Sequence, residues 1–361
     1  MQHFKFSFAV TAVLLGLAAW WGFHHGGAAG VLQAVWIATV LGVMEVSLSF
    51  DNAVVNASVL RHWNPFWQRL FLTVGIVVAV FGMRLLFPLL IVAFATGLGL
   101  AEVWHMATAT PDVYAAHLAA SHGQVAAFGG AFLLLVFLNF LFDEEKELHW
   151  LGWLEKKMGQ HGTDSLAVLL ALLAVFACMG VAGQEEKFGV LTAGVTGVAV
   201  YLAVHWISTL LEEEPQPDDD SDATETGVEA VGAGAAALAL SAAGRGSIGA
   251  FLYLEVLDAS FSFDGVIGAF AITSDVVVIM LGLAIGAMFV RSLTVFLVHK
   301  GTLDEFVYLE HGAHYAIGIL ALIMLASVKY DIPEWFTGLS GVAFIAISLW
   351  SSILYKRRRE R

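Results

Sequence analysis

The chain is poor in charged residues and has a single cysteine. Only 13% of its 361 residues are charged and 59% are hydrophobic, whereas soluble domains carry about 25% charged residues. This composition excludes a cytosolic enzyme and a disordered regulator. Cys178 has no partner within the chain, so an intrachain disulfide and a cysteine-built metal site are excluded as well. The composition predicts a membrane protein with several spans.

Several sequence motifs are also missing. No Gly-x-x-x-x-Gly-Lys-Ser/Thr stretch occurs, which argues against an ATP-driven pump. His-Glu-x-x-His and Gly-x-Ser-x-Gly signatures are missing too, so we expect no enzyme and no bound cofactor. The short alternation of apolar and polar residues that marks outer-membrane barrels is not seen. We therefore predict an all-α protein, and any transport through it would use an ion gradient or run downhill.

Ten apolar runs are long enough to cross a bilayer core of about 30 Å as helices. With both termini placed inside, thirteen lysines and arginines fall in inner segments and two in outer loops, and cytoplasmic loops carry such an excess. We predict a polytopic transmembrane helix bundle of about ten spans with a cytoplasmic carboxyl terminus. The runs are Phe6–Phe23, Val31–Leu60, Phe66–Ala95, Val125–Phe142, Ser165–Val181, Phe188–Leu211, Ser247–Thr273, Val276–Val298, Ala313–Lys329 and Trp335–Tyr355.

Two of these runs resemble each other. Glu45-Val-Ser-Leu-Ser-Phe-Asp51 matches Asp258-Ala-Ser-Phe-Ser-Phe-Asp264 in its acids, serines and phenylalanine. The second acidic span follows the first by five spans, an odd number, so the two cross the membrane in opposite senses. This predicts an inverted-topology repeat, a common design of secondary transporters. In the next span of each copy a glycine precedes an arginine by nine residues: Gly75 and Arg84, then Gly282 and Arg291.

The repeat and the linker between its copies divide the chain. Nine acidic residues and no base lie between Glu212 and Glu229, and such a charge run is typical of a solvated linker. We also hypothesise that this linker recruits cations. The predicted regions are an N-terminal span (1–30), a first repeat (31–142), two connecting spans (143–211), an acidic cytoplasmic linker (212–246), a second repeat (247–330), and a last span with a basic cytoplasmic tail (331–361).

The charged residues inside the spans predict the function. Each costs about 2.5–3.5 kcal/mol at the centre of a span, and five acids outnumber two arginines there, so a cation is favoured over an anion. Carboxylate and amide oxygens suit hard divalent cations. We predict a metal site formed by Glu45, Asp51, Asn52, Asp258 and Asp264, with Arg84 and Arg291 compensating charge and Asn56, Ser49, Glu255 and Ser262 as secondary candidates.

Helical geometry separates the acids of each copy. At about 100° per residue, Asp51 lies roughly 120° from the face that carries Glu45 and Asn52, and Asp264 is displaced from Asp258 in the same way. Either each helix is unwound at the Ser-Phe-Asp step, or one acid binds the ion while the other pairs with an arginine. We favour local unwinding in both copies, because broken helices commonly form such sites.

At these residues the sequence resembles the TerC family, named for tellurium-resistance protein C. The resemblance covers about Val31–Ala95 and Ile248–Val298, and Gly265 departs from it by standing where the first copy has Asn52. It implies a bacterial inner-membrane protein of divalent-metal homeostasis, with manganese(II) efflux as the associated activity and kinship with LysE-type exporters.

The resulting hypothesis is a secondary transporter that exports a divalent metal cation, manganese(II) first among the candidates. Its expected partners are membrane lipid, the metal ion and protons as coupling ion, with a homo-oligomer left open and no nucleic acid. The alternative is a membrane scaffold that supports metal loading of exported proteins or tellurite resistance without transport. His311 and His314, three residues apart on a helix, are candidates for a regulatory or entrance site.

Overall fold

The computed structural model describes residues 4–61, 63–75, 77–143, 146, 148–212, 248–300 and 306–359. Within these ranges every regular element is a helix, which confirms the all-α prediction. Eight helices in the described part are long and apolar enough to cross a membrane. The linker hypothesis falls on residues 213–247, which lie outside the described ranges.

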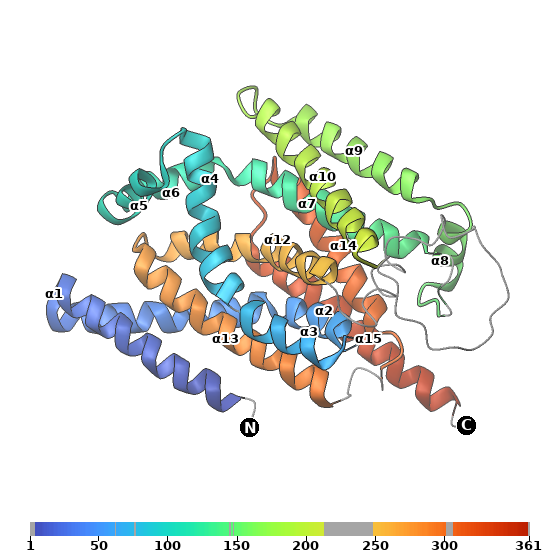
Figure 1. Ribbon diagram of the computed structural model, residues 1–361, viewed down its shortest axis with the longest axis horizontal. Helices are drawn as coiled ribbons and strands as arrows, with labels where there is room; N and C mark the ends of the chain where they lie inside the picture. Colours follow the sequence, from blue (N-terminus) through green and yellow to red (C-terminus); the bar gives the residue numbers. More distant parts are fainter. Residues whose placement is uncertain are drawn as a thin grey trace.

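The elements follow one another along the chain as Figure 1 labels them. They are α1 (Lys5–Leu48), α2 (Phe50–Leu60), α3 (Pro65–Leu70), the π-helices η2 (Phe71–Gly75) and η3 (Val78–Leu86), α4 (Phe87–Thr96), α5 (Leu100–Ala109), α6 (Pro111–Ala120), α7 (His122–Phe142), α8 (Gly152–Gly159), α9 (Asp164–Val181), α10 (Lys187–Glu212), α12 (Ile248–Ile272), α13 (Val276–Lys300), α14 (Leu309–Ser327) and α15 (Glu334–Arg359).

Two features explain why the described part has eight candidate spans although the sequence has ten apolar runs. The first is that α1 doubles back on itself at Gly27, whose φ of 59° glycine adopts without steric cost. Its two arms pack so closely that a Cβ on Gly22 would lie 2.2 Å from the Gly30 carbonyl oxygen. The second is that α12 has the length of a span but carries three acidic residues, more than an ordinary span tolerates.

The predicted unwinding of the acidic segment is not found in either copy, although the first copy is bent at one residue. Ser49, with φ of −100° and ψ of 17°, separates α1 from α2. Backbone hydrogen bonds continue on both sides of it, so the interruption is a kink. The second copy, α12, runs through its Ser-Phe-Asp step without a break.

The span Pro65–Phe94 contains two π-helical stretches, η2 and η3. π-Helical turns are rare and are frequently found at functional sites. Arg84 lies in η3, and its guanidinium donates a hydrogen bond to the Ala79 carbonyl, five residues earlier, at 2.7 Å. The wider winding therefore helps to fix the direction of this side chain.

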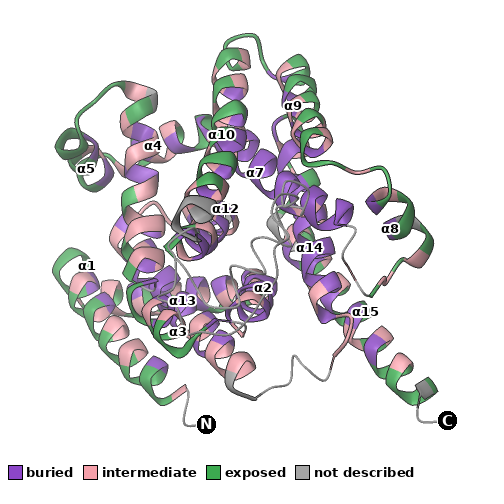
Figure 2. Ribbon diagram, turned by 45° about the vertical axis from the view of Figure 1, so that its right-hand side comes forward, coloured by how far each residue is buried: buried purple, intermediate pink, exposed green. Residues whose placement is uncertain are grey.

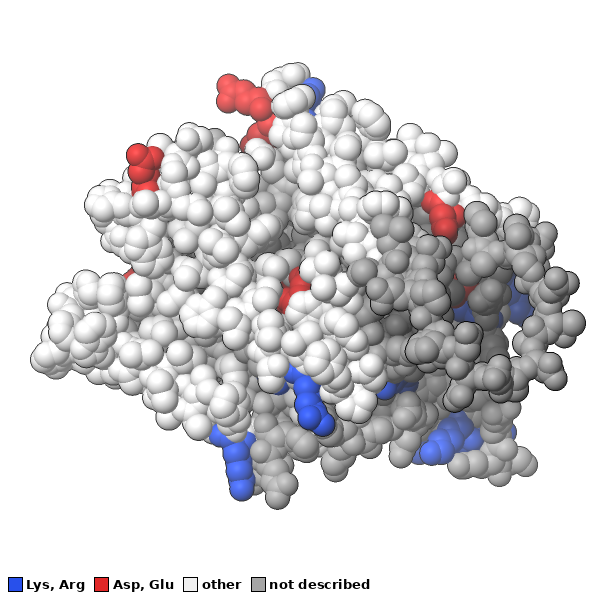
Figure 3. All heavy atoms as spheres, in the orientation of Figure 1, with Lys and Arg blue, Asp and Glu red and all other residues white. Residues whose placement is uncertain are grey.

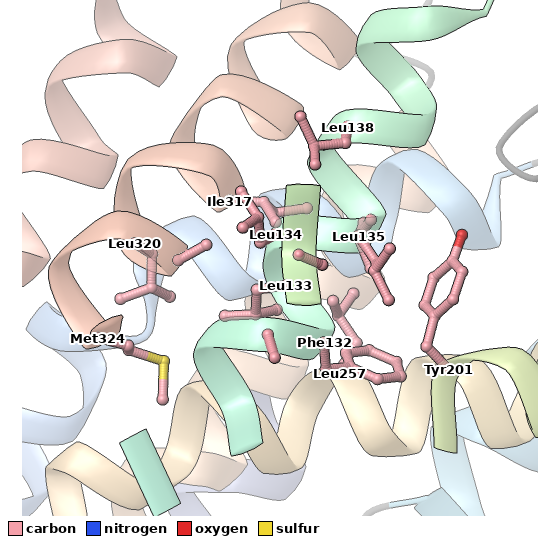
Figure 4. Packing of buried hydrophobic residues seen from close by; sticks show 14 of the residues in the cluster. Phe132, Leu133, Leu134, Leu135, Leu138, Tyr201, Leu257, Ile317, Leu320 and Met324 are labelled. Atoms are coloured by element: carbon pink, nitrogen blue, oxygen red, sulfur yellow. The ribbon is translucent and has the colours of Figure 1, made fainter. Parts of the chain in front are cut away.

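Helix α7 forms the apolar centre of one half of the molecule. Its side chains Phe132, Leu133, Leu134 and Leu135 pack against α12 and α14, as Figure 4 shows. The buried colour in Figure 2 follows α7 and α2, whereas α9 carries many exposed residues. In the other half, α1 lies along α13.

The charged side chains are distributed unevenly over the surface in Figure 3. Most of the visible basic side chains lie along the lower edge, and most of the visible acidic ones lie higher. Both chain ends also lie at the lower edge in Figure 1. The side that holds the termini is thus the more basic one in this view.

Candidate functional site

An ion pair lies inside the helix bundle at the end of α1. Glu45 Oε1 pairs with the Arg84 guanidinium, and the two residues are 1% and 5% exposed. Ser49 donates its hydroxyl to the same oxygen of Glu45 at 2.9 Å. A pair buried this deeply is expensive to break, because removal of one partner leaves an uncompensated charge.

The second copy of the acidic segment meets the first next to this pair. Asn52 Nδ2 donates to Asp258 Oδ1 at 2.5 Å. Glu45, Asn52, Arg84 and Asp258 form what we call the central cluster. The structure thus brings together three of the five predicted metal ligands, Glu45, Asn52 and Asp258.

A small cavity of about 50 Å³, the Glu255 cavity, borders the central cluster on one side. Buried polar groups are normally hydrogen-bonded, yet several atoms here have no hydrogen-bond partner in the described part of the chain. They are Glu255 Oε1, Asn56 Oδ1, Arg84 Nε and Arg291 Nη1. Among the residues that line the cavity are five polar or charged side chains and a glycine: Asn56, Arg84, Glu255, Asp258, Arg291 and Gly75.

Asp51 lies apart from Asp258, in a separate cavity of about 30 Å³ that we call the Asp51 cavity. Its Oδ1 accepts the backbone N–H of Asn52 at 2.9 Å. Its Oδ2 faces α15 so closely that a Cβ on Gly341 would lie 2.3 Å away. Of the other candidates, Ser49 lines this cavity, Ser262 is buried on α12, and the side chain of Asp264 lies outside the described part.

Glycines make room for the buried acids. A Cβ on Gly286 would lie 2.3 Å from the Cβ of Glu45, and one on Gly265 would lie 3.0 Å from Glu45 Oε2. A Cβ on Gly75 would lie 2.7 Å from Glu255 Oε1. The close approach to Glu45 explains why glycine stands at position 265 where the first copy has asparagine. Sequence reasoning missed Gly341 and Thr337, because a lone small residue in an apolar span gives no distinct signal.

The ligand set limits the metal ions that fit. Across the described residues, no group of three or more histidine, cysteine or acidic side chains is placed to hold a metal. Glu255 and Asp258 offer two carboxylates to the Glu255 cavity, and Asn56 offers an amide oxygen. Magnesium-like ions keep several waters and bind through one or two carboxylates. The residues present therefore fit a partly hydrated hard cation.

The two histidines of α14 lie in a different region. We call it the Glu155 cluster, and it consists of Glu155, His311, His314 and Tyr315. His311 Nε2 lies 2.9 Å from the Leu148 carbonyl and 3.6 Å from Glu155 Oε2. His314 stacks on Phe140, with ring centroids 3.9 Å apart and an angle of 7° between the rings. Both imidazoles thus make hydrogen bonds or ring contacts within the protein.

Comparison with known proteins corrects the family. The fold defines a multi-pass helical membrane protein, and residues 50–359 match the profile of the family described as "Protein of unknown function (DUF475)". The chain belongs to that family. The TerC assignment is therefore wrong, because an acid-x-Ser-x-Ser-Phe-Asp segment is too short to distinguish between families that bury carboxylates in a span.

One curated relative is similar over part of the chain. The uncharacterized membrane protein YceF of Bacillus subtilis (strain 168) is 32% identical over 110 residues. The match covers 30% of this chain and 42% of YceF, so the chain spans less than half the length of that relative. No solved structure matches the chain significantly.

Proposed function

We propose that the protein is a secondary transporter that moves a hard divalent cation out of the cytoplasm. The observation that carries the proposal is the Glu255 cavity, where two buried carboxylates and an amide oxygen face one small space. Glu255 Oε1 and Asn56 Oδ1 have no hydrogen-bond partner among the described residues. Unsatisfied buried acceptors are costly, and a cation entering the cavity satisfies them.

The charges around the cavity favour a cation that is released again. Arg84 is already engaged by Glu45, so the charges of Glu255 and Asp258 remain for a ligand. Arg291 lines the same cavity, and its single positive charge can offset one of the two negative charges once the cation has left. Two carboxylates and water bind an ion less tightly than a closed protein cage, which suits a carrier that must let its cargo go.

The packing between the copies supports an inverted repeat of about ten spans. Gly42 of the first acidic segment packs against Gly282 of the second arginine span, and a Cβ on Gly42 would lie 3.3 Å from the Gly282 carbonyl oxygen. Glu255, which occupies the position of Gly42 in the second copy, packs against Gly75, which occupies the position of Gly282 in the first. Such an exchange of partners is expected from two copies related by a pseudo-twofold axis.

The orientation and the metal are parts of the same proposal. The basic lower edge in Figure 3 supports a cytoplasmic carboxyl terminus in a bacterial inner membrane. Manganese(II) was favoured through the TerC resemblance, so only the oxygen ligands now define the cargo. They suit manganese(II), magnesium and calcium alike, and manganese(II) serves as the probe.

Flux into liposomes that contain the purified protein tests the proposal. We expect manganese(II) to cross with the wild type, and we expect Asp258→Asn and Glu255→Gln to slow the flux by about tenfold or more. Glu185→Gln, an exposed acid in the loop before α10, is the matched control and should transport like the wild type. No flux of manganese(II), magnesium or calcium with the wild type would contradict transport and favour the scaffold alternative.

A further inference from the structure

The Glu45–Arg84 ion pair forms part of the wall between two cavities. Arg84 lines the Glu255 cavity, and Glu45 lines the Asp51 cavity. The two cavities have no lining residue in common. The Glu45 carboxylate faces both of them. Its Oε1 pairs with Arg84, and its Oε2 would lie 3.0 Å from a Cβ on Gly265, which lines the Asp51 cavity.

The two cavities reach towards opposite ends of the spans. The Glu255 cavity reaches Thr294 near the end of α13. The Asp51 cavity shares Thr337, near the start of α15, with a larger cavity of about 280 Å³ that we call the vestibule. The vestibule also contains Asp331, between α14 and α15. In the predicted topology the ion pair thus stands between a space on the cytoplasmic side and a space on the outer side.

Arg84 has a second set of acids next to it. Its Nη1 donates to the Ala79 carbonyl of the same helix at 2.7 Å, and its Nη2 pairs with Glu45. Its Nε has no hydrogen-bond partner among the described residues, although buried polar groups normally have one. The cavity that Arg84 lines also contains the carboxylates of Glu255 and Asp258. A rotation of the side chain about the Ala79 contact therefore lets Arg84 exchange Glu45 for an acid of that cavity.

The charges of the buried side chains balance both before and after such an exchange. While a divalent cation lies in the Glu255 cavity, Glu255 and Asp258 neutralise it and Arg84 neutralises Glu45. Arg291 is only partly buried, so water can stabilise its charge meanwhile. Once the cation has left, Arg291 offsets one of the two carboxylates and Arg84 can offset the other. The exchange thus avoids an uncompensated buried charge, which is the costly case.

We propose that Arg84 is the gate of the transporter. It leaves Glu45 for the carboxylates of the Glu255 cavity as the cation crosses the wall, and the cation then passes through the Asp51 cavity and leaves through the vestibule. This inference rests on the proposed function and names the gate and the release route of that site. Among the described residues, Glu45 and Asp51 are the acids that the cation passes in the Asp51 cavity, and the side chain of Asp264 lies outside them.

The double variant Glu45→Gln/Arg84→Gln tests the gate. It replaces the ion pair by two amides that can hydrogen-bond to each other, so it creates no unpaired buried charge. Manganese(II) binding to the purified protein, measured by titration calorimetry, should stay within about threefold of the wild type, because Glu255, Asp258 and Asn56 are unchanged. Manganese(II) flux in liposomes should nevertheless fall by about tenfold or more, because no guanidinium replaces the departing cation. Arg84→Lys keeps the charge and should retain part of the flux.

The single variants separate a gate from a purely structural pair. Glu45→Gln frees Arg84 to bind the carboxylates of the Glu255 cavity, so manganese(II) binding should weaken by about tenfold or more, although Glu45 does not line that cavity. Arg84→Gln removes this competitor, and the folded variant should bind manganese(II) at least as tightly as the wild type. The matched control is Arg61→Gln, from a second arginine–glutamate pair with Glu310 at 3.3 Å, which should leave binding and flux unchanged.

Thr337→Phe tests the release route. A bulky ring where the Asp51 cavity meets the vestibule should lower manganese(II) flux by about tenfold or more. Binding in the Glu255 cavity should stay within about twofold of the wild type, because none of its lining residues is changed. Leu339→Phe, at an exposed position of the same helix, should alter neither flux nor binding.

The gate and the release route can fail while the proposed function holds. Wild-type flux in the double variant, or weaker binding in folded Arg84→Gln, would overturn the gate. Wild-type flux in Thr337→Phe would overturn the release route. These results leave transport by the wild type intact. If the wild type itself neither binds nor moves manganese(II), magnesium or calcium, the proposed function fails and the gate fails with it.

Discussion

Two buried glutamates of this protein have opposite surroundings. Glu155 on α8 accepts hydrogen bonds from the backbone N–H groups of Trp150 and Leu151, at 3.1 and 3.2 Å, and from the Tyr315 hydroxyl at 3.0 Å. Glu255 on α12 is buried to a similar degree, but its Oε1 has no partner among the described residues. Burial alone therefore does not separate a structural acid from a ligand-binding one.

The difference identifies which acids stabilise the fold. A carboxylate with all its acceptor positions filled holds its donors in place, and replacing it strands them. A carboxylate without partners costs stability and is retained for another purpose. The same contrast divides the arginines, since Arg84 has an ion-pair partner and Arg291 has an unpartnered Nη1.

The arginine contrast predicts the largest effect. Arg84→Ala should lower the free energy of unfolding by about 3–5 kcal/mol, because Glu45 would be left charged and buried. Arg291→Ala should cost less than about 1 kcal/mol, because Arg291 makes no ion pair with the described residues. Thermal unfolding in detergent can be followed by a thiol-reactive dye, since the buried Cys178 is the one cysteine of the chain. Equal losses of unfolding free energy in Arg84→Ala and Arg291→Ala would contradict the distinction between a structural and a non-structural arginine.

The glutamate contrast predicts the next effect. Glu155→Ala should destabilise the protein by about 3 kcal/mol, because three donors lose their acceptor. Glu255→Gln should leave stability unchanged or raise it by about 1 kcal/mol, because it removes a buried charge. The same dye assay measures both, and transport should show the reverse order, with Glu255→Gln the inactive variant. A large loss of stability in Glu255→Gln would make this acid structural.

Sequence reasoning located the acids but not their partners. The repeat of Glu45–Asp51 in Asp258–Asp264 identified Glu45 and Asp258, which both lie in the central cluster, because a charged side chain in an apolar run stands out. The separate position of Asp51 depends on α15 and on Gly341, which lies far away in the sequence and belongs to no motif. Partners of this kind are set by tertiary packing.

The backbone irregularities show the same limit. The two polar faces of each acidic helix predicted unwinding at the Ser-Phe-Asp step, whereas the structure has a one-residue kink at Ser49. The π-helices around Arg84 could not be predicted, because a shift of the hydrogen bonds by one residue leaves the hydrophobic pattern of a span unchanged. The turn at Gly27 could be located only as the gap between two apolar runs, and α12 is continuous although it carries the same motif as the kinked segment.

The glycines that face the two kinds of acid predict a smaller difference. Gly286→Ala should destabilise by about 1–3 kcal/mol, because the new methyl group would meet Glu45 Cβ at 2.3 Å and the Gly42 carbonyl oxygen at 2.8 Å, neither of which can move easily. The methyl group of Gly75→Ala would lie 2.7 Å from the carboxylate end of Glu255, which can rotate, and at an ordinary contact distance of 3.4 Å from the Phe71 ring. This substitution should cost less than about 1 kcal/mol but weaken manganese(II) binding, measured by titration calorimetry. An equal loss of stability would show that Glu255 is held rigidly.

The smallest expected effect is on the pH dependence of stability, and it comes from Lys146 beside the Glu155 cluster. Burial lowers the pKa of its amine, although Glu155 and Asp143 oppose the shift. Because the unfolded chain holds this proton more firmly than the folded one, stability should rise with pH between the lowered pKa and the ordinary lysine value. Lys146→Met should flatten the slope of melting temperature against pH just below the ordinary lysine pKa of about 10.4, whereas Lys156→Met, at an exposed residue nearby in the sequence, should keep it. If the slope survives in Lys146→Met, the pH dependence of stability comes from another group. The amine of Lys146 would then hold its proton equally firmly in the folded and the unfolded chain.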